Sequence, residues 1–313
     1  MRLPLVLLCS TLCLIAPPHA LAQNAADDGF NAVVGLGSGY NVNANVTYVT
    51  ASGRDLKLDV YQPSPAKAAT PVVLNIHGGG WVAGAREGDL LRLLPYMRMG
   101  FAVVNVEYRL AKTALAPAAV EDTLCALQWV GRNAKQYNFD LSKVVVTGGS
   151  AGGHLALATA MIPSDSPFTN QCAPSGSWSG PYVNPAPKVA AVINWYGITD
   201  VADMLQGPNV RSYAVGWFGA MEGRMELARR LSPLSYVRKD GPAVLTIHGD
   251  ADPLVPYAHA VRLRQAMDKA GEKNRLLTIK DGGHGGFTPE QNQQAYLAVR
   301  DFLRELGIVA PAQ

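Results

Sequence analysis

Ser150 lies at the centre of a short segment, Val144 to Ala156, whose residue types favour nucleophilic catalysis. A β-branched run predicts a strand, small residues follow, and an apolar run that favours a helix begins after the serine. So short a link forces a sharp turn, for which the flanking Gly148 and Gly152 leave room. The turn places the Ser150 hydroxyl above the sheet, where a helix dipole stabilises developing negative charge. The alternative is an ordinary glycine-containing turn.

A serine hydroxyl is a weak nucleophile at neutral pH, so it needs an imidazole base and a carboxylate that orients the imidazole. His284 follows the last predicted strand in a glycine-rich loop, from which its ring can reach Ser150. Asp252 follows the preceding strand and is preferred to Asp250, which is suited to bonding its own loop, and to Asp281. The chain order serine, acid, histidine is that of the α/β-hydrolase triad.

Other histidines are alternative bases, and each is expected to be structural or on the surface. His154 points along the helix after Ser150, whereas His248 precedes the acid too closely. His259 lies within a predicted helix. His77 is expected to support the loop that follows it and not to take part in catalysis.

The segment 77–81, His-Gly-Gly-Gly-Trp, follows the first buried strand. Three successive glycines weaken a fold unless the backbone must approach a ligand closely. Two exposed N–H groups of this loop, with that of Ala151, can bind the negative charge that forms on a carbonyl oxygen under attack. A flexible turn is the alternative interpretation.

Strands and helices alternate around these motifs, which predicts right-handed crossovers and a mostly parallel sheet covered on both faces. An antiparallel hairpin over 46–61 opens one edge, and residues 163–187 and 200–232 are expected to be lid-like insertions. The fold class is therefore α/β, with a single domain over 46–313. Buried strands are predicted at 72–76, 101–106, 144–147, 189–193, 243–247 and 276–279, and the main helices near 87–99, 118–136, 256–270 and 289–306.

The composition is that of a globular protein with one sizeable core, since 48% of the 313 residues are hydrophobic and 16% are charged. The net charge of +3 provides no basic surface of the kind that nucleic acid requires. No cluster has metal-ligand spacing, and no phosphate-binding loop with its lysine is present. We therefore expect no cofactor, no metal and no nucleic-acid partner; the sequence leaves the oligomeric state open.

The first 22 residues are typical of a secretory signal peptide. Arg2 precedes a short apolar core, and the small residues at its end predict cleavage after Ala22. The apolar run is shorter than the roughly 20 residues that cross a membrane, so a membrane anchor is not expected. The mature protein is then secreted or periplasmic, and residues 23–45 are expected to form a loose leader.

Two cysteines, Cys125 and Cys172, lie beyond the predicted cleavage point. An even pair in an exported protein favours a disulfide between them. Two separate buried thiols are the alternative, because sequence alone does not give the distance between the residues.

Together these motifs resemble those of α/β-hydrolase serine esterases of the hormone-sensitive-lipase type, and most closely the bacterial bifunctional feruloyl and acetyl-xylan esterase-like group. The resemblance spans roughly residues 45–308. It rests on 77–81, Glu107-Tyr108-Arg109-Leu110, Glu121-Asp122 before Trp129-Val130, 148–156, 248–252 with Val255-Pro256, and Gly283-His284-Gly285.

This resemblance implies Ser150 as nucleophile, Asp252 as acid and His284 as base. It also implies that the backbone N–H groups of Gly79, Gly80 and Ala151 form the oxyanion hole. Tyr108 and Arg109 would tie the strand end near this loop, with ordinary surface polarity as their alternative.

Relatives of the hormone-sensitive-lipase type often carry a helical N-terminal cap, and this sequence has only about 23 residues between the predicted cleavage point and the hairpin. Any cover over the site must then come from 163–187 and 200–232. Aromatic side chains could wall an acyl or aromatic pocket, although core packing is the alternative for all except Trp81, which adjoins the oxyanion loop. The candidates are Trp81, Trp178, Tyr196 and Trp217, with Tyr182, Trp195 and Phe218 beside them.

The sequence thus predicts a serine carboxylic ester hydrolase that forms an acyl-enzyme with short-chain acyl or aromatic acyl esters, such as acetyl or feruloyl esters of plant polysaccharide. One alternative is an amide or peptide hydrolase on the same scaffold, arylformamidase-like or dipeptidyl-peptidase-like. The missing propeller domain argues against the peptidase, and export argues against the formamidase. The other alternative is a catalytically inactive binding protein, against which the complete set of triad residues argues.

Overall fold

The computed structural model describes residues 29–66, 68–172 and 186–310. The chain divides into two units, Met1–Gly39 and Tyr40–Gln313. The prediction of a loose leader over 23–45 is wrong for the described part of that range, because residues 29–38 form a helix and strand β1 (Tyr40–Ala51) follows. The polar start of this strand is ordered by backbone pairing, with Tyr40 opposite Pro63. Residues 1–28, which include the predicted signal peptide, lie outside the described residues.

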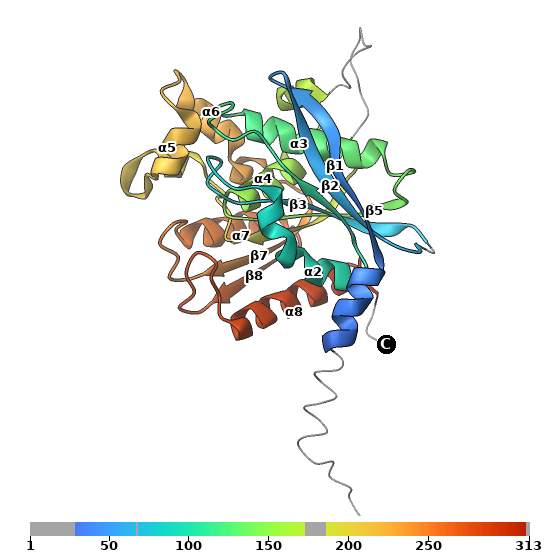
Figure 1. Cartoon of the computed structure of the whole chain (residues 1–313). Helices are drawn as coiled ribbons and strands as arrows, with labels where there is room; N and C mark the ends of the chain where they lie inside the picture. The colour runs from blue at the N-terminus through green and yellow to red at the C-terminus, as the bar shows by residue number, and fades with distance from the viewer. Residues whose placement is uncertain (1–28, 67, 173–185, 311–313) are drawn as a thin grey trace, which may run out of the picture. The chain divides into compact units, whose positions relative to one another are not determined.

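Within the described residues, the second unit is built on an eight-stranded sheet with the order β1-β2-β4-β3-β5-β6-β7-β8 (Figure 1). β1 and β2 form the predicted antiparallel hairpin, β2 is antiparallel to β4, and the remaining neighbours are parallel. This confirms the α/β-hydrolase type of sheet with an antiparallel edge. The further strands are β2 (Arg54–Pro63), β3 (Thr70–Ile76), β4 (Ala102–Val106), β5 (Phe139–Gly149), β6 (Val189–Trp195), β7 (Ala243–Gly249) and β8 (Asn274–Ile279).

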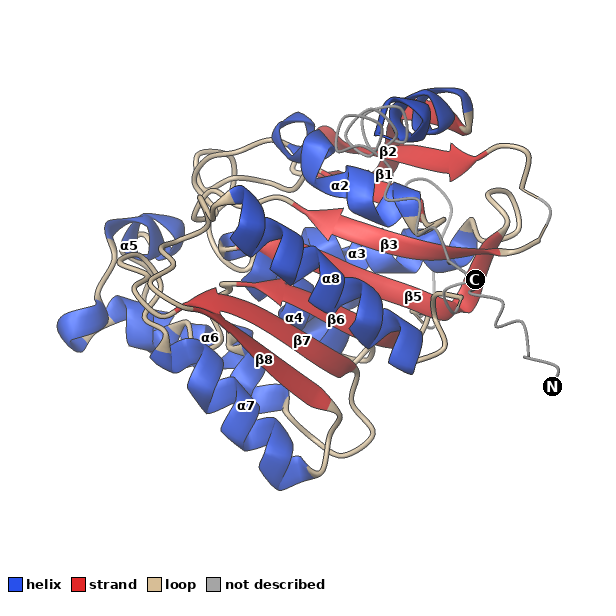
Figure 2. Cartoon of the chain, turned by 90° about the horizontal axis from the view of Figure 1, so that it is seen from below, coloured by secondary structure: helices blue, strands red, loops and turns tan. Residues whose placement is uncertain are grey.

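Helices cover both faces of the sheet. In Figure 2, α2 (Leu90–Arg98) and α8 (Pro289–Glu305) lie in front of the strands, and α3 (Ala118–Arg132) and α4 (Ala151–Met161) lie behind them. Edge-on packing of Tyr96 against Tyr296 joins the first pair, and a 2.8 Å hydrogen bond from Thr159 to Thr123 joins the second. The other helices are α5 (Ser212–Phe218), α6 (Arg224–Leu231) and α7 (Ala258–Ala270).

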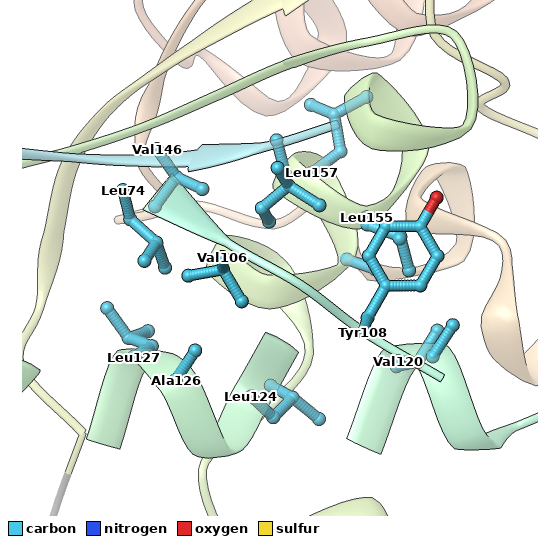
Figure 3. Packing of buried hydrophobic residues seen from close by; sticks show 14 of the residues in the cluster. Leu74, Val106, Tyr108, Val120, Leu124, Ala126, Leu127, Val146, Leu155 and Leu157 are labelled. Atoms are coloured by element: carbon cyan, nitrogen blue, oxygen red, sulfur yellow. The ribbon is translucent and has the colours of Figure 1, made fainter. Parts of the chain in front are cut away.

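The buried core between the sheet and α3 fixes the position of α4, and therefore that of Ser150. Leu74, Val106 and Val146 project from the strands toward Leu124 and Leu127 of α3 (Figure 3). Burying each such side chain stabilises the fold by about 1.5–3 kcal/mol. Because α4 is buried along nearly its whole length, the helix that begins at the nucleophile turn has little freedom to move.

The expected insertions contain short elements where they are described. Residues 200–232 include α5, α6 and the 3₁₀ helices η3 (Ala202–Leu205) and η4 (Gly207–Asn209), and η5 (Pro233–Tyr236) follows. Within 163–187 the structure describes η2 (Pro167–Cys172) but not 173–185, where Trp178 and Tyr182 lie. Cys125 and Cys172 form the favoured disulfide, which joins α3 to η2. No helix in the described ranges has both the length and the apolar character needed to cross a membrane.

Candidate active site

The turn at Ser150 joins β5 to α4 and is shaped by close backbone contacts. Ser150 has a φ of 59° and a ψ of −123°, a conformation that costs a residue with a side chain about 1–3 kcal/mol. A Cβ at Gly152 would lie 2.1 Å from the Ile76 carbonyl oxygen, and one at Gly148 would lie 2.4 Å from that of Gly152. The N–H of Ser150 donates to the Trp195 carbonyl at 2.9 Å. The turn is therefore rigid and holds the hydroxyl at the carboxyl end of the sheet.

The structure brings Ser150, His284 and Asp252 together from three separate strand ends. His284 Nε2 lies 2.8 Å from Ser150 Oγ, and His284 Nδ1 lies 2.7 Å from Asp252 Oδ2. An Nδ1–H that donates to the carboxylate leaves Nε2 free to accept the serine proton. The arrangement can therefore generate a serine nucleophile.

The loop after β7 orients the Asp252 carboxylate through hydrogen bonds. Its Oδ1 accepts the N–H groups of Leu254 and Val255 at 2.8 and 2.9 Å. Burial acts to raise the pKa of Asp252, but hydrogen bonds from His248, His284 and Val255 outweigh it and hold this pKa well below its ordinary value. The carboxylate thus stays ionised and can stabilise a protonated His284.

His248 contacts the same carboxylate oxygen as His284, a contact that was not predicted from the sequence. Its Nε2 lies 3.2 Å from Asp252 Oδ2 and 3.0 Å from the Val255 carbonyl oxygen, and its side chain is fully buried. Within the described residues, its Nδ1 has no hydrogen-bond partner. The spacing of four residues was the available signal, because the turn folds Asp252 back over His248.

The other candidate bases and acids make hydrogen bonds away from Ser150. His154 is buried, accepts the Trp81 Nε1–H on Nδ1 at 3.2 Å, and places Nε2 2.8 Å from the Leu231 carbonyl. Burial lowers the pKa of His154 to about 4 and that of His259 to about 3. Asp250 is exposed and accepts the Asp281 N–H at 2.6 Å. None of these side chains contacts Ser150.

Side chains with a structural role hold the glycine loop after β3 and the chain beside it. The His77 ring stacks on Tyr108 with centroids 4.3 Å apart, and its Nδ1 lies 2.7 Å from the Gly78 carbonyl oxygen. The Tyr108 hydroxyl donates to the His77 carbonyl at 3.2 Å. Arg109 donates to both oxygens of the buried Asp122 on α3, at 2.9 and 2.7 Å, and so fixes the adjoining chain.

The loop backbone leaves donors available. Gly79 and Gly80 have φ values of 114° and 60°, and a Cβ at Gly79 would lie 2.0 Å from the Ala83 carbonyl oxygen. Neither Gly79 nor Gly80 donates a backbone hydrogen bond within the described part of the chain. Ala151 opens α4, where the first N–H groups have no partner within the helix. These three groups can serve an oxyanion.

A cavity of about 550 Å³ lies over Ser150 and His284. Its walls include Ser150 and His284, the glycine loop, the predicted pocket residue Tyr196, and three side chains for which the sequence predicted no role: Asp89, Arg92 and Tyr213. Tyr196 is thus placed as predicted. The two charged residues carried no motif signal, because they read as ordinary polar positions near the start of a helix.

Trp81 and Trp217 are corrections to the predicted pocket wall. Both are fully buried, and their rings stack on each other with centroids 4.2 Å apart, beside His154. A φ of 63° at Trp81 takes this side chain out of the glycine loop and into the core. The paired indoles therefore support the loop from beneath. Trp178, the remaining candidate, lies outside the described residues.

No group of three His, Cys, Asp or Glu side chains able to hold a metal ion occurs in the ranges that the structure describes. The polar groups around Ser150 are instead a base, a carboxylate and backbone donors. Groups of this kind can carry out acyl transfer through a serine nucleophile.

Comparison with known proteins agrees with this geometry. The chain is 26% identical to the esterase LipQ of Mycobacterium tuberculosis over 80% of its own length, and the match spans 59% of that longer relative. It is 31% identical to a truncated carbohydrate esterase from gut microbiota, covering 86% of this chain and 97% of that one with a TM-score of 0.67.

A propionate-bound esterase from Thermogutta terrifontis is 25% identical, with a TM-score of 0.71 over 88% of this chain and 97% of its own. A TAP-like protein model matches residues 225–311. The BD-FAE family model matches residues 58–267, which include Ser150 and Asp252. The chain therefore belongs to the BD-FAE family of α/β-hydrolases.

Proposed function

We propose that this chain is a serine carboxylic ester hydrolase. The observation that carries the proposal is the hydrogen-bonded series from Ser150 through His284 to Asp252, with distances of 2.8 and 2.7 Å. Both distances lie within the range in which a base can take the proton of a nucleophile. Geometry of this kind also argues against an inactive binding protein.

The reaction begins when Ser150 Oγ attacks the carbonyl carbon of the ester and its proton passes to His284 Nε2. The carbonyl oxygen becomes an oxyanion, which the N–H groups of Gly79, Gly80 and Ala151 stabilise. The bond to the alcohol oxygen then breaks, and His284 returns its proton to that oxygen. Asp252 remains ionised throughout and stabilises the imidazolium.

Water completes the reaction by the same route in reverse. His284 removes a proton from water as the hydroxide attacks the acyl carbon on Ser150. The bond to Oγ breaks, Ser150 recovers the proton from His284, and the carboxylic acid leaves. Each step uses groups already in place, so no cofactor is required by this scheme.

The substrates are esters of short acyl groups or of aromatic acids, including acetyl or feruloyl groups on plant polysaccharide. Membership of the BD-FAE family and the likeness to a carbohydrate esterase support this class. The cavity of about 550 Å³ lies within the range of small-molecule sites. Export through a signal peptide cleaved after Ala22 fits a polymer-linked substrate, and the Cys125–Cys172 disulfide fits an oxidising compartment.

Ser150→Ala tests the function directly. Wild-type protein should hydrolyse p-nitrophenyl acetate and react with a fluorophosphonate probe, and the variant should do neither. Ser142→Ala is the matched control, because Ser142 is exposed and its hydroxyl bonds to Asp140 away from the cavity. Equal labelling of wild type and Ser150→Ala would contradict the proposal.

A substrate panel and one mass measurement test the finer claims. Methyl ferulate, acetylated xylan and p-nitrophenyl esters compared under one condition should give measurable release from at least one carbohydrate or aromatic ester. Protein recovered from the periplasm or medium of the producing cell should begin at Gln23. Activity confined to amides, or retention of residues 1–22, would overturn the corresponding claim.

A further inference from the structure

A second cavity of about 290 Å³ adjoins the cavity over Ser150. Asp89, Arg92, Gly149 and Tyr196 line both spaces, so the two share one wall. The mechanism described above uses only the first cavity. The second has no role in it.

The Tyr196 ring forms the partition between these cavities. On one side it packs edge-on against His284, with centroids 4.8 Å apart, and His284 lines only the first cavity. On the other side it packs edge-on against Phe287, with centroids 5.9 Å apart, and Phe287 lines only the second. Removing the ring would therefore join the two spaces.

The surrounding structure holds Tyr196 firmly in this position. Arg92 Nη1 donates to the Tyr196 hydroxyl at 2.7 Å, and the Tyr196 N–H donates to the Ile247 carbonyl at 2.7 Å. The residue has a φ of 41°, which is unfavourable for a bulky side chain and must be held by such contacts.

Two glycines make the room that this ring occupies. A Cβ at Gly285 would lie 2.8 Å from the Tyr196 hydroxyl oxygen, and one at Gly149 would lie 3.1 Å from it. Gly149 adjoins the nucleophile and Gly285 adjoins the base. The chain is thus built to place this aromatic ring directly beside the reacting groups.

The second cavity suits an apolar acyl group. Several of its lining side chains are aromatic, and its two charged residues, Asp89 and Arg92, lie on the wall that it shares with the first cavity. Its amide and hydroxyl groups already have protein partners: Asn75 donates to Asn105 at 2.9 Å and Thr147 donates to the Ile193 carbonyl at 3.0 Å. Groups satisfied in this way gain little from a polar ligand, whereas the aromatic surface gains from burial. Its aromatic lining residues are Tyr96, Trp195, Tyr196, Phe287 and Tyr296.

We propose that the second cavity is an extension of the acyl-binding site from which the Tyr196 ring excludes the acyl group, so that Tyr196 determines how long an acyl group the enzyme accepts. The inference rests on the proposed ester hydrolysis. With Tyr196 in place, the acyl group is confined to the space beside Ser150, and small acyl groups react best. A longer aliphatic chain needs the volume behind the ring.

The test compares Tyr196→Ala with Tyr196→Phe on p-nitrophenyl acetate, butyrate and octanoate. Tyr196→Ala should raise the octanoate-to-acetate ratio of kcat/KM by about tenfold or more, since one or a few methylenes that gain a pocket change this parameter 10-fold to 200-fold. The ratio cancels any loss common to all substrates that arises from the contact with His284. Tyr196→Phe keeps the ring and loses only the bond to Arg92, so its ratio should stay near that of wild type.

A filling substitution provides an independent check. Asn292 lines only the second cavity, so Asn292→Trp added to Tyr196→Ala should lower the octanoate-to-acetate ratio again. Asn292→Trp alone should leave the octanoate-to-acetate ratio near that of wild type, because the partition is intact. If Tyr196→Ala does not fold, as judged by circular dichroism, Tyr196→Leu takes its place in both comparisons.

An unchanged or lower ratio in the folded variant would overturn the inference, even where acetate hydrolysis persists. Failure of wild type to hydrolyse any ester would instead overturn the proposed function. A ratio that rises equally in Tyr196→Phe would assign selectivity to the Arg92 hydrogen bond and would contradict the partition.

Discussion

The Ser150 turn and the Asp252 carboxylate both lie at the ends of parallel strands, yet they are held in different ways. Steric contact dominates at Ser150, where Gly148 and Gly152 leave no space for a methyl group. Hydrogen bonds dominate at Asp252, whose carboxylate accepts from two backbone N–H groups and lies against His248 and His284. The Ser150 turn therefore has no room for an added atom at either glycine, whereas the Asp252 carboxylate keeps other hydrogen bonds when one donor is replaced. We therefore expect a substitution that adds atoms in the Ser150 turn to abolish activity, and loss of one hydrogen-bond donor to Asp252 to reduce activity only in part.

Gly152→Ala should abolish activity and strongly destabilise the fold. Its Cβ would lie 2.1 Å from the Ile76 carbonyl oxygen and 2.7 Å from that of His77, both of which are backbone atoms that cannot rotate away. We expect esterase activity to fall to background and stability to fall by about 4 kcal/mol, at the upper end for one substitution. Urea unfolding and p-nitrophenyl acetate assays measure the two effects.

Gly216→Ala is the matched control for that variant. Gly216 lies within α5, and an added Cβ would meet only Val82 Cγ1 at an ordinary 3.7 Å. Alanine favours helix more than glycine does, so this variant should be at least as stable as wild type. Equal behaviour of the two variants would refute a steric basis for the Ser150 turn.

His248→Phe should reduce activity only in part. Loss of the Nε2 donor leaves one contact fewer on Asp252 Oδ2, so the carboxylate orients His284 less well. We expect kcat to fall by about tenfold, the scale of one net hydrogen bond, with KM unchanged. Initial rates over a range of ester concentrations separate these parameters.

His248→Gln distinguishes this positioning role from simple packing. Its amide can still donate toward Asp252, so it should recover part of the lost kcat, although it fills the buried space less well than phenylalanine. A phenylalanine variant as active as wild type, or more active than the glutamine variant, would show that His248 does not position the acid.

A pH dependence of stability is also expected, and it arises at the buried His154. The pKa of His154 is about 4 in the folded protein against an ordinary value of 6.5, because its site is buried. Between these values the unfolded chain binds the proton and the folded chain does not. This contribution is fully present above pH 6.5 and is lost as the pH falls toward 4.

His154→Gln should therefore reduce the loss of unfolding free energy between pH 6.5 and pH 4, whatever its effect at neutral pH. Part of the slope should persist, because burial also lowers the pKa of His259, to about 3. Denaturant titrations at several pH values give the slope. The same slope in both proteins would show that His154 does not titrate in this way.

The sequence predicted the nucleophile turn, the acid and the base because each lies in a local pattern at the end of a buried strand. Glycine spacing around Ser150 and the loops at Asp252 and His284 carry these roles without reference to distant residues. The sheet was predictable for the same reason, since its β-branched runs are short and bounded. The helix at 29–38 and the polar first residues of β1 were not, because pairing and not composition orders that strand.

The walls of the cavity were not predictable, because they depend on the direction in which each aromatic side chain leaves its loop. Trp81 and Tyr196 both follow buried strands and both have positive φ values, of 63° and 41°. Trp81 turns into the core, where it meets Trp217 and His154, whereas Tyr196 turns between two cavities. No local pattern distinguishes these outcomes, since Trp81 depends on distant packing partners and Tyr196 on the space that Gly149 and Gly285 leave.

The paired indoles of Trp81 and Trp217 should give a spectroscopic signal. Trp81 and Trp217 are stacked with centroids 4.2 Å apart and ring planes 14° from parallel, a separation at which their electronic transitions couple. Near-ultraviolet circular dichroism depends on fixed packing of such chromophores. Trp81 adjoins the glycine loop proposed to bind the oxyanion, and its Nε1–H donates to His154 on the helix that begins after Ser150. The protein therefore carries an intrinsic optical signal that should report loosening of the candidate active site, without added dye or substrate.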